Sequence, residues 1–252
     1  MDNPPSAADV AGVLKPSGLE IRGWLRPERE EAPVLESGEP TALICLVGHA
    51  GGAFWPAFEH WRKPHPHVSD PLDTWSRHVI CPIAVTLAGE AVFPSDKPWQ
   101  PFQLWAMAAE GVKPSPLGML IHPDYGLWHG YRGAILFGAQ AAMALECSDS
   151  ECETGESVAR AHHPCDTCEG RPCLSACPVA AFTAEGFAAG QCRGHLETPV
   201  GRRECMDRGC LARDACPVGR DHRYSDAQIR FHMAAFSLND VARTHPDPDA
   251  AL

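Results

Sequence analysis

Eight of the twelve cysteines lie within residues 165–216, and their spacing is typical of a metal centre. The first group reads Cys-x2-Cys-x4-Cys-x3-Cys-Pro and ends at Cys177-Pro178, while the second group ends at Cys216-Pro217. A cubane iron–sulfur cluster needs four thiolates, and a tight loop can supply three of them while the fourth comes from elsewhere in the chain. Two cysteine groups that both close on Cys-Pro therefore predict two [4Fe-4S] clusters. The eight candidate ligands are Cys165, Cys168, Cys173, Cys177, Cys192, Cys205, Cys210 and Cys216.

Other thiol chemistry accounts for this pattern less well. Zinc also binds four thiolates at Cys-x2-Cys spacing, but a zinc site needs neither paired Cys-Pro endings nor eight thiolates in one short segment. Radical S-adenosylmethionine enzymes need Cys-x3-Cys-x2-Cys; Cys173 and Cys177 begin that motif, but position 180 holds alanine. Disulfides are disfavoured because the N-terminus carries no export signal, and we expect a cytoplasmic, reducing location. Zinc is the alternative that stays open.

The segment from residue 165 to 217 resembles the two-cluster ferredoxin module, and CLSACPVAAFT at 173–183 matches its cysteine loop and short helix. In such ferredoxins the cysteine before proline ligates the cluster of the other group. The resemblance thus implies a first site of Cys165, Cys168, Cys173 and Cys216 and a second site of Cys177, Cys192, Cys205 and Cys210. The x4 and x5 gaps are longer than is usual in the family. The widely spaced second group is most similar to the ferredoxin region of epoxyqueuosine reductases, which pair this module with a cobalamin-binding domain.

The four remaining cysteines are not expected to bind metal. Cys45 lies in an apolar run and Cys81 in a predicted helix, where each is expected to be a small buried hydrophobic residue. Cys147 and Cys152 lie in an acidic segment, where neighbouring carboxylates raise the pKa of a thiol and argue against a reactive nucleophile.

Composition and charge exclude several classes of protein. The 252 residues are 44% hydrophobic, which is enough to build a core. Lys and Arg total 21 against 32 Asp and Glu, and the net charge of −11 argues against nucleic acid and anionic membranes as partners. The longest apolar run spans residues 42–47, far short of the roughly 20 residues of a membrane helix. We therefore expect no membrane partner.

The elements that must position these residues fall into two parts, because all seven tryptophans precede residue 145 and most cysteines follow it. We predict a first domain at 1–145, a linker at 146–160, a ferredoxin-like domain at 161–222, and a C-terminal helix and tail at 223–252 that packs on the first domain. In the first domain, strands are expected at 19–25, 41–47, 91–93, 118–121 and 131–137, and helices at 54–61, from 70 onward and at 102–109. This order predicts an α+β sandwich of helices on one sheet.

Helix boundaries follow from a few capping residues. Asp70 is the expected N-cap of a helix with Pro71 at its first position, and Pro82 is expected to kink or end that helix. Loops are expected to dominate after the linker. Ser225 and Gln228 form a predicted capping box, in which each side chain bonds a backbone N–H of the other residue, and a helix at 226–236 should follow.

A second candidate site lies at residues 118–128. No Gly-x-Gly-x-x-Gly follows a strand, and residues 48–52 lack the Lys-Ser/Thr of a phosphate-binding loop, so a nucleotide site has no support. From the residues alone, His122 before proline is expected to be a capped turn histidine, with a functional histidine as the less favoured alternative. The run Ile-His-Pro-x-Tyr-Gly-x-Trp, followed by Tyr131-Arg132-Gly133 and an apolar strand, resembles the CblC family of cobalamin-processing proteins. Fragments at 40–48, 69–73, 93–111 and 223–225 match in the same order, and epoxyqueuosine reductases have a similar turn.

This resemblance implies a nitroreductase-like, CblC-like α/β sandwich with an inserted two-cluster ferredoxin-like domain. It also implies cobalamin held base-off, with His122 as a pocket residue and not a cobalt ligand. This fold often carries a flavin, but the sequence holds no motif for one. The residues implied to line the cobalamin pocket are Leu117, Gly118, Leu120, His122, Tyr125, Gly126 and Trp128.

Three functions follow from these sites. The leading hypothesis is an iron–sulfur cobalamin reductase or processing enzyme that reduces cob(II)alamin or removes an upper ligand, with electrons from a low-potential donor. The second is an epoxyqueuosine-reductase type of enzyme acting on tRNA; the acidic charge counts against it, and it needs a general acid, for which Asp96 is the candidate. The third is a non-enzymatic cobalamin chaperone.

Overall fold

The computed structural model describes residues 6–28, 33–145, 163–183 and 185–238, and it divides into two compact units. The first unit comprises Met1–Lys113 and His129–His162, and the second comprises Pro114–Trp128 and His163–Leu252. The predicted linker, with Cys147 and Cys152, lies outside the described residues, as does the C-terminal tail. No helix of the described chain is long and apolar enough to cross a membrane.

The first unit is built on a four-stranded antiparallel sheet in the order β1-β2-β6-β3. The strands are β1 (Glu20–Leu25), β2 (Leu43–Ala50), β3 (Glu90–Val92) and β6 (His129–Phe137). Strand β2 is buried along nearly its whole length, as its continuous apolar run predicts. It pairs with β6 from Leu43 opposite Phe137 to Ala50 opposite His129, with a register shift between Val47 and Gly48.

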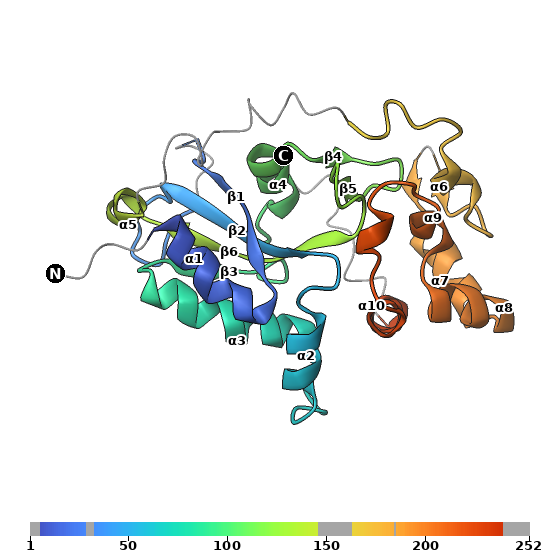
Figure 1. The fold of residues 1–252 in the computed structure, drawn as a ribbon, viewed down its shortest axis with the longest axis horizontal. Coiled ribbons are helices and arrows are strands. Elements are labelled where there is room, and N and C mark those ends of the chain that lie inside the picture. Colours follow the sequence, from blue (N-terminus) through green and yellow to red (C-terminus); the bar gives the residue numbers. More distant parts are fainter. Residues whose placement is uncertain (1–5, 29–32, 146–162, 184, 239–252) are drawn as a thin grey trace. The chain divides into compact units, whose positions relative to one another are not determined.

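Helices cover both faces of this sheet, which makes the first unit an α+β fold (Figure 1). Its helices are α1 (Ala7–Leu14), α2 (Trp55–Arg62), α3 (Pro71–Thr86), α4 (Phe102–Glu110) and α5 (Ala139–Ala144). A Cβ added to Gly23 of β1 would lie 2.9 Å from the Cβ of Ala109 in α4, and one added to Gly133 of β6 would lie 2.9 Å from Ile80 in α3. Gly23 pairs with Leu46 of β2, and Gly133 pairs with Val47, the next residue of that strand. Because successive residues of a strand point to opposite faces, the two glycines face opposite sides of the sheet. The expected α+β class is confirmed at this level.

Helix α3 begins at the predicted residue but continues past Pro82, which was expected to kink or end it. Asp70 is the N-cap residue, but its φ is +46° and its side chain makes no capping hydrogen bond. Pro71 occupies the first turn as predicted, and the helix continues to Thr86, so Pro82 does not end it. The carbonyl that loses its partner through Pro82 belongs to His78, which is exposed, so water can satisfy it.

The second unit consists mainly of short helices. They are α6 (Pro172–Ser175), α7 (Ala189–Glu197), α8 (Pro199–Gly201), the π-helical turn η3 (Arg202–Met206), α9 (Leu211–Asp214), the 3₁₀ turn η4 (Arg220–His222) and α10 (Asp226–Leu238). Short strands form two small sheets: β4 (Lys113–Pro114) with β5 (Leu120–Ile121), and β7 (Phe182–Thr183) with β8 (Gly186–Phe187). Residues 189–206 are helical almost without a break, in α7, α8 and η3, although loops were expected there. Helix α7 contains two glycines and has little intrinsic helical propensity, so its sequence does not predict a helix.

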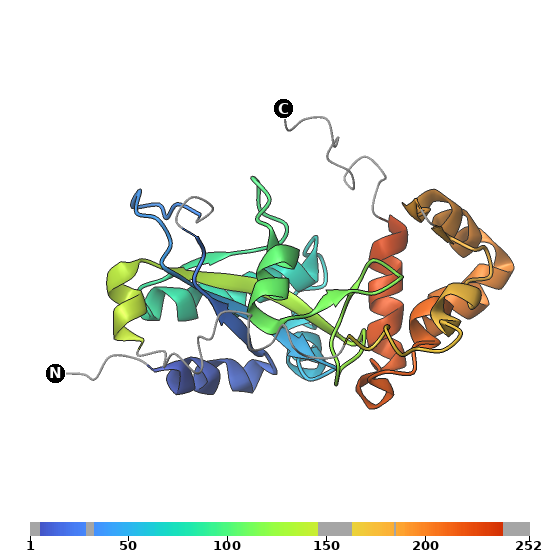
Figure 2. The same ribbon diagram turned by 90° about the horizontal axis from the view of Figure 1, so that it is seen from above.

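The two units differ from the predicted domains in one place. Residues 114–128 were expected in the first domain, but they belong to the second unit. Helix α10 contacts η3 within the second unit (Figure 2), and its Ile229 packs against Trp128, which belongs to the segment expected in the first domain. Both segments carry apolar side chains that pack beside the cysteine loops, and the sequence pattern alone does not specify that partner.

Candidate metal centre

The eight predicted cysteines form two sets of interacting thiols in the second unit. Electrostatic interactions join Cys165 to Cys168, Cys173 and Cys216. A separate group of interactions joins Cys192 to Cys177, Cys205 and Cys210. These two sets are the ones that crossed ligation implies, with the last cysteine of each sequence group placed among the cysteines of the other.

Burial and backbone hydrogen bonds act on these thiols in opposite directions. Burial, and then the neighbouring thiols, raise the pKa of Cys165 and of Cys192 to about 11. The backbone N–H of Ala181 donates to Sγ of Cys177 at 3.3 Å. The Cys165 and Cys192 thiols are therefore protonated at neutral pH, and a bound metal must displace their protons. Hydrogen bonds from N–H groups to sulfur are also one of the means by which proteins set the potential of an iron–sulfur cluster.

The first site lies in an apolar part of the second unit. Leu117, Ile121 and Leu127 pack in one cluster with Cys173 and Cys216, and Cys165 packs against it. All four cysteines of the first site line a single small pocket together with these leucine and isoleucine side chains. Residues 114–128 therefore form a wall of the first site.

Within the described ranges, no three His, Cys, Asp or Glu side chains are placed to hold a single metal ion. A zinc ion needs its four ligands to meet around one point at about 2.3 Å. In a cubane cluster each thiolate binds a different iron at a corner of the cube, so the sulfurs need not meet. The donor sets consist of thiols alone, which is the donor chemistry that a cubane cluster uses.

Comparison with known proteins adds no assignment. No family model matches the chain, and no curated protein matches it significantly. The likeness to two-cluster ferredoxins and to cobalamin-processing proteins therefore depends on the short motifs themselves.

The turn that carries His122 is held by its own hydrogen bonds. The Nδ1 atom of His122 accepts the backbone N–H groups of Asp124 at 3.0 Å and of Tyr125 at 3.3 Å. The His122 ring also stacks on Tyr125, with ring centroids 4.3 Å apart, and Tyr125 meets His222 edge to face at 4.9 Å. His122 is a capped turn histidine, as its residue context alone predicts.

This turn lies directly against the loop that follows Cys216. A Cβ on Gly126, whose φ is +57°, would lie 2.1 Å from the carbonyl oxygen of Val218. A Cβ on Gly219, whose φ is +69°, would lie 2.2 Å from the carbonyl carbon of Tyr125. The two backbones can approach this closely only because both positions lack a side chain. Gly219 was not among the predicted site residues, although glycine in a turn is the residue that adopts a positive φ without steric cost.

Of the seven residues implied to line a cobalamin pocket, three are occupied by packing inside the second unit. Leu117 belongs to the wall of the first site, Gly126 abuts Val218, and Trp128 packs against Tyr224 and Ile229. The other four, which are partly or fully exposed, are Gly118, Leu120, His122 and Tyr125. A Cβ on Gly118 would meet no atom within 4 Å. Only these four are placed to face a ligand on the turn.

Asp96, the candidate general acid of the tRNA hypothesis, is held as an ion-paired carboxylate. One oxygen pairs with the Arg77 guanidinium, and the other accepts the Phe93 backbone N–H at 2.9 Å. Arg77 also lies over the Phe93 ring, 4.3 Å from its centroid. Both oxygens of this carboxylate therefore already accept from donors of the protein, whereas a general acid must direct a proton of its own at the substrate.

The first unit contains a buried polar network that the sequence did not indicate. The Arg22 guanidinium pairs with Glu110 at 2.6 Å and with Glu20 at 2.6 Å, and the Tyr131 hydroxyl donates to Glu110. Burial raises the pKa of Glu110 and of Tyr131. Since nothing there resembles a ligand site, we attribute to this network a role in stability.

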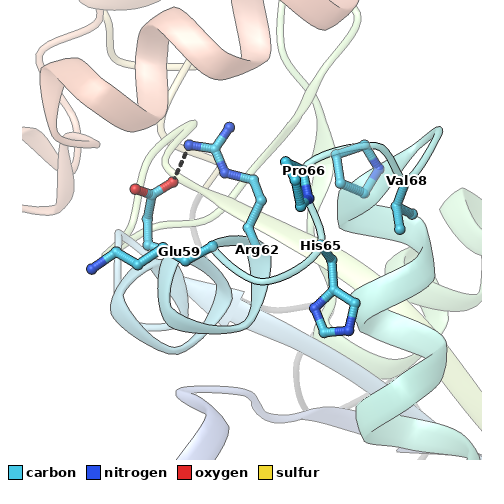
Figure 3. Close-up of a pocket in the computed structure, with 7 residues that line it drawn as sticks. Glu59, Arg62, His65, Pro66 and Val68 are labelled. Carbon is cyan, nitrogen blue, oxygen red and sulfur yellow. Dashed lines mark hydrogen bonds and ion pairs between the residues drawn. The ribbon is translucent and has the colours of Figure 1, made fainter.

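A separate pocket lies at the end of α2 in the first unit (Figure 3). Glu59 and Arg62 form an ion pair at 2.6 Å on one side of it, and Pro66 and Val68 lie on the other side. None of the predicted site residues lines this pocket.

Proposed function

We propose that this chain is an iron–sulfur electron-transfer protein that binds two [4Fe-4S] clusters by crossed ligation and delivers their electrons to a corrinoid. The observation that carries the proposal is that Cys165, Cys168, Cys173 and Cys216 line one small pocket, and that Cys177 and Cys210 pack against the apolar cluster beside it. Bound clusters would supply one-electron stores at low potential. Cys165, Cys168, Cys173 and Cys216 would hold the first cluster, and Cys177, Cys192, Cys205 and Cys210 the second.

The chain's own contribution to the clusters is an apolar wall and a set of N–H donors. Leu117, Ile121 and Leu127 exclude water from the first site, which lowers the local permittivity. Ala181 donates its N–H to the sulfur of Cys177 in the second site. Burial and hydrogen bonding therefore differ between the two sites, and these are two of the factors that set cluster potentials.

The corrinoid part of the proposal rests on the motif that resembles those of CblC proteins and epoxyqueuosine reductases. On the same resemblance we propose a nitroreductase-like fold for the first unit. The motif's turn abuts the loop that follows Cys216, so a ligand on the turn would lie beside the first cluster. Cobalamin bound base-off would supply a redox-active cobalt. His122 accepts two N–H groups at Nδ1, so its neutral ring carries the proton on Nε2 and acts there as a donor and not as a cobalt ligand.

Two observations favour this function over the tRNA hypothesis. The Asp96 carboxylate accepts from Arg77 through one oxygen and from the Phe93 N–H through the other, so both oxygens of the proposed general acid are already engaged. The net charge of −11 also opposes binding of a polyanion. We place the protein in the cytoplasm, with a low-potential electron donor as its partner.

The test is an anaerobic titration of the cluster-loaded protein with hydroxocobalamin, followed by absorbance. We expect a shift to the base-off spectrum and formation of cob(I)alamin after a low-potential reductant is added. His122→Ala should weaken binding, while His65→Ala, a histidine of the first-unit pocket, should not. Absence of any spectral change at all ratios would remove the corrinoid from the proposal. Binding without reduction would support the chaperone, and saturable tRNA binding the second enzyme class.

A further inference from the structure

Exposed arginines lie close in the chain to Cys205, a buried cysteine of the second predicted site. Cys205 belongs to η3 and is 7% exposed. Arg202 and Arg203 belong to the same turn and are exposed, and so is Arg208, which follows it. Nη2 of Arg223 donates to the carbonyl oxygen of Arg208 at 3.0 Å, which holds the backbone at that position. Positive charge therefore lies at the surface two or three residues from a predicted cluster ligand.

Helix α10 adds a fourth exposed arginine to this surface. The helix contacts η3, and a Cβ on Gly209 would lie 2.9 Å from Cγ2 of Ile229. Arg208 and Arg230, the chain neighbours of these two contacting residues, are both exposed. Val200, two residues before η3, is exposed by 46%. Arginine is enriched at protein interfaces, whose centres are apolar, so this composition is typical of a docking surface. The arginine face is made up of Arg202, Arg203, Arg208 and Arg230.

The positive charge of the arginine face is not neutralised by the carboxylates that the structure describes. Within the described ranges, none of its four arginines forms an ion pair. The nearby carboxylates Asp214 and Asp226 both pair with Arg223. Residues 193–230 hold eight arginines against six Asp and Glu, a balance of +2 in a chain of net charge −11. This part of the second unit is therefore positive in an otherwise acidic protein.

The cysteine loop of the first site carries the opposite charge. Between Cys165 and Cys173 the charged residues are Asp166, Glu169 and Arg171, a balance of −1, and all three are exposed. Opposite charges steer the diffusional encounter of two proteins, and like charges oppose it. An acidic protein is therefore drawn to the second site and repelled from the loop of the first.

We propose that the arginine face is the docking surface of an acidic electron-carrier protein that passes electrons to the second cluster. The proposal rests on the proposed function, because it identifies the low-potential donor by its chemistry. The carrier loses one electron and the cluster gains one, and no bond forms or breaks. A compact acidic protein fits this face better than nucleic acid does. Glu204 and Asp207 lie among the arginines, and the acidic remainder of the chain repels a polyanion that extends beyond them.

The test is stopped-flow reduction of the cluster-loaded protein by a reduced, acidic plant-type ferredoxin at about 0.01 M salt. In Arg202→Gln/Arg203→Gln we expect the second-order rate constant to fall about tenfold or more, because the variant loses electrostatic steering. The matched control Lys15→Gln/Arg26→Gln removes two exposed charges of the first unit and should stay within about twofold of wild type. At about 1 M salt the rates of wild type and variant should converge, since screening then acts within about 3 Å. Reduced methyl viologen is a small reductant that needs no docking surface, and it should reduce all three proteins at equal rates.

The outcomes separate this proposal from the proposed function. Wild-type protein that takes up no iron and sulfide would contradict the proposed function itself. Wild-type protein with full iron that methyl viologen reduces and ferredoxin does not would overturn only the docking surface, and so would a double variant with full iron and an unchanged rate. Saturable tRNA binding that the double variant loses would overturn it by assigning the face to nucleic acid. If the double variant takes up no iron, Arg208→Gln/Arg230→Gln should slow reduction by ferredoxin in the same way, and an unchanged rate there also overturns the proposal.

Discussion

Alanine at Gly126 should push the His122–Gly126 turn away from the loop that follows Cys216. The new Cβ would lie 2.1 Å from the Val218 carbonyl oxygen and 2.6 Å from its carbonyl carbon, and both atoms belong to the backbone. The φ of +57° is also strained for any residue with a Cβ. Gly118 provides the matched control, because its φ is +77° but a Cβ there would meet no atom within 4 Å. Gly118→Ala shares the backbone strain without the clash.

The magnitudes follow from these two contributions. Left-handed backbone costs a residue with a side chain roughly 1–2 kcal/mol, and this applies to both variants. Overpacking a well-packed position costs about 1–3 kcal/mol more, and this applies only to Gly126→Ala. We therefore expect Gly126→Ala to reduce the stability of the second unit by about 2–5 kcal/mol and Gly118→Ala by about 1–2 kcal/mol.

The measurement is native-state hydrogen exchange of the purified protein, resolved by peptide. The peptides that cover residues 114–128 and the segment after Cys216 report the free energy of local opening in the second unit. Gly126→Ala should lower that free energy more than Gly118→Ala, while peptides of β2 and β6 keep their protection. Equal effects of the two alanines would refute the close approach of the two backbones.

Three further predictions concern the first unit and the chemistry. Glu110→Ala should lower the free energy of unfolding, measured with urea, by about 3 kcal/mol, because it leaves the buried charge of Arg22 without its buried carboxylate partner. Glu20→Ala removes the half-exposed partner and should cost no more than about 1 kcal/mol. Equal costs for the two variants would contradict the buried network. Asp96→Asn should leave cob(I)alamin formation within about twofold of wild type, and a loss of about 100-fold or more would restore Asp96 as a general acid. Burial raises the pKa of Cys45, so its thiol should resist alkylation in the native protein, and stability should fall as pH rises above the ordinary thiol pKa of about 8.5. Cys45→Ala should reduce that pH dependence, and an unchanged dependence would contradict the assignment.

The strands of the first unit could be predicted because each carries a strong local signal. The apolar run of β2 predicts a strand buried on both faces, and β6 follows a glycine with another such run. The assignment of residues 114–128 to the second unit could not be predicted, because Leu117, Ile121 and Leu127 indicate burial but do not identify what they pack against. They pack against the cysteine loops around Cys173 and Cys216, which lie between 46 (Leu127 to Cys173) and 99 (Leu117 to Cys216) residues farther along the chain.

The predicted capping box at the start of the C-terminal helix is only half present. Ser225 Oγ accepts the Gln228 N–H at 3.3 Å, which is one half of the predicted capping box. The other half is missing: the Gln228 side chain is fully buried and has no hydrogen-bond partner within the described chain, because the helix turns that residue inward. Spacing predicted the grouping of the thiols, but the place of Arg213 against the rings of Trp128 and Tyr224 depends on long-range packing that no local pattern encodes.

The most direct test of the central claim, two cubane clusters on eight cysteines, is analysis of iron and acid-labile sulfide in the anaerobically reconstituted protein. We predict about eight iron atoms and about eight sulfides per chain, falling to about four of each in Cys216→Ala and in Cys165→Ala, which belong to the same set. About two zinc atoms per chain with no labile sulfide would contradict the account.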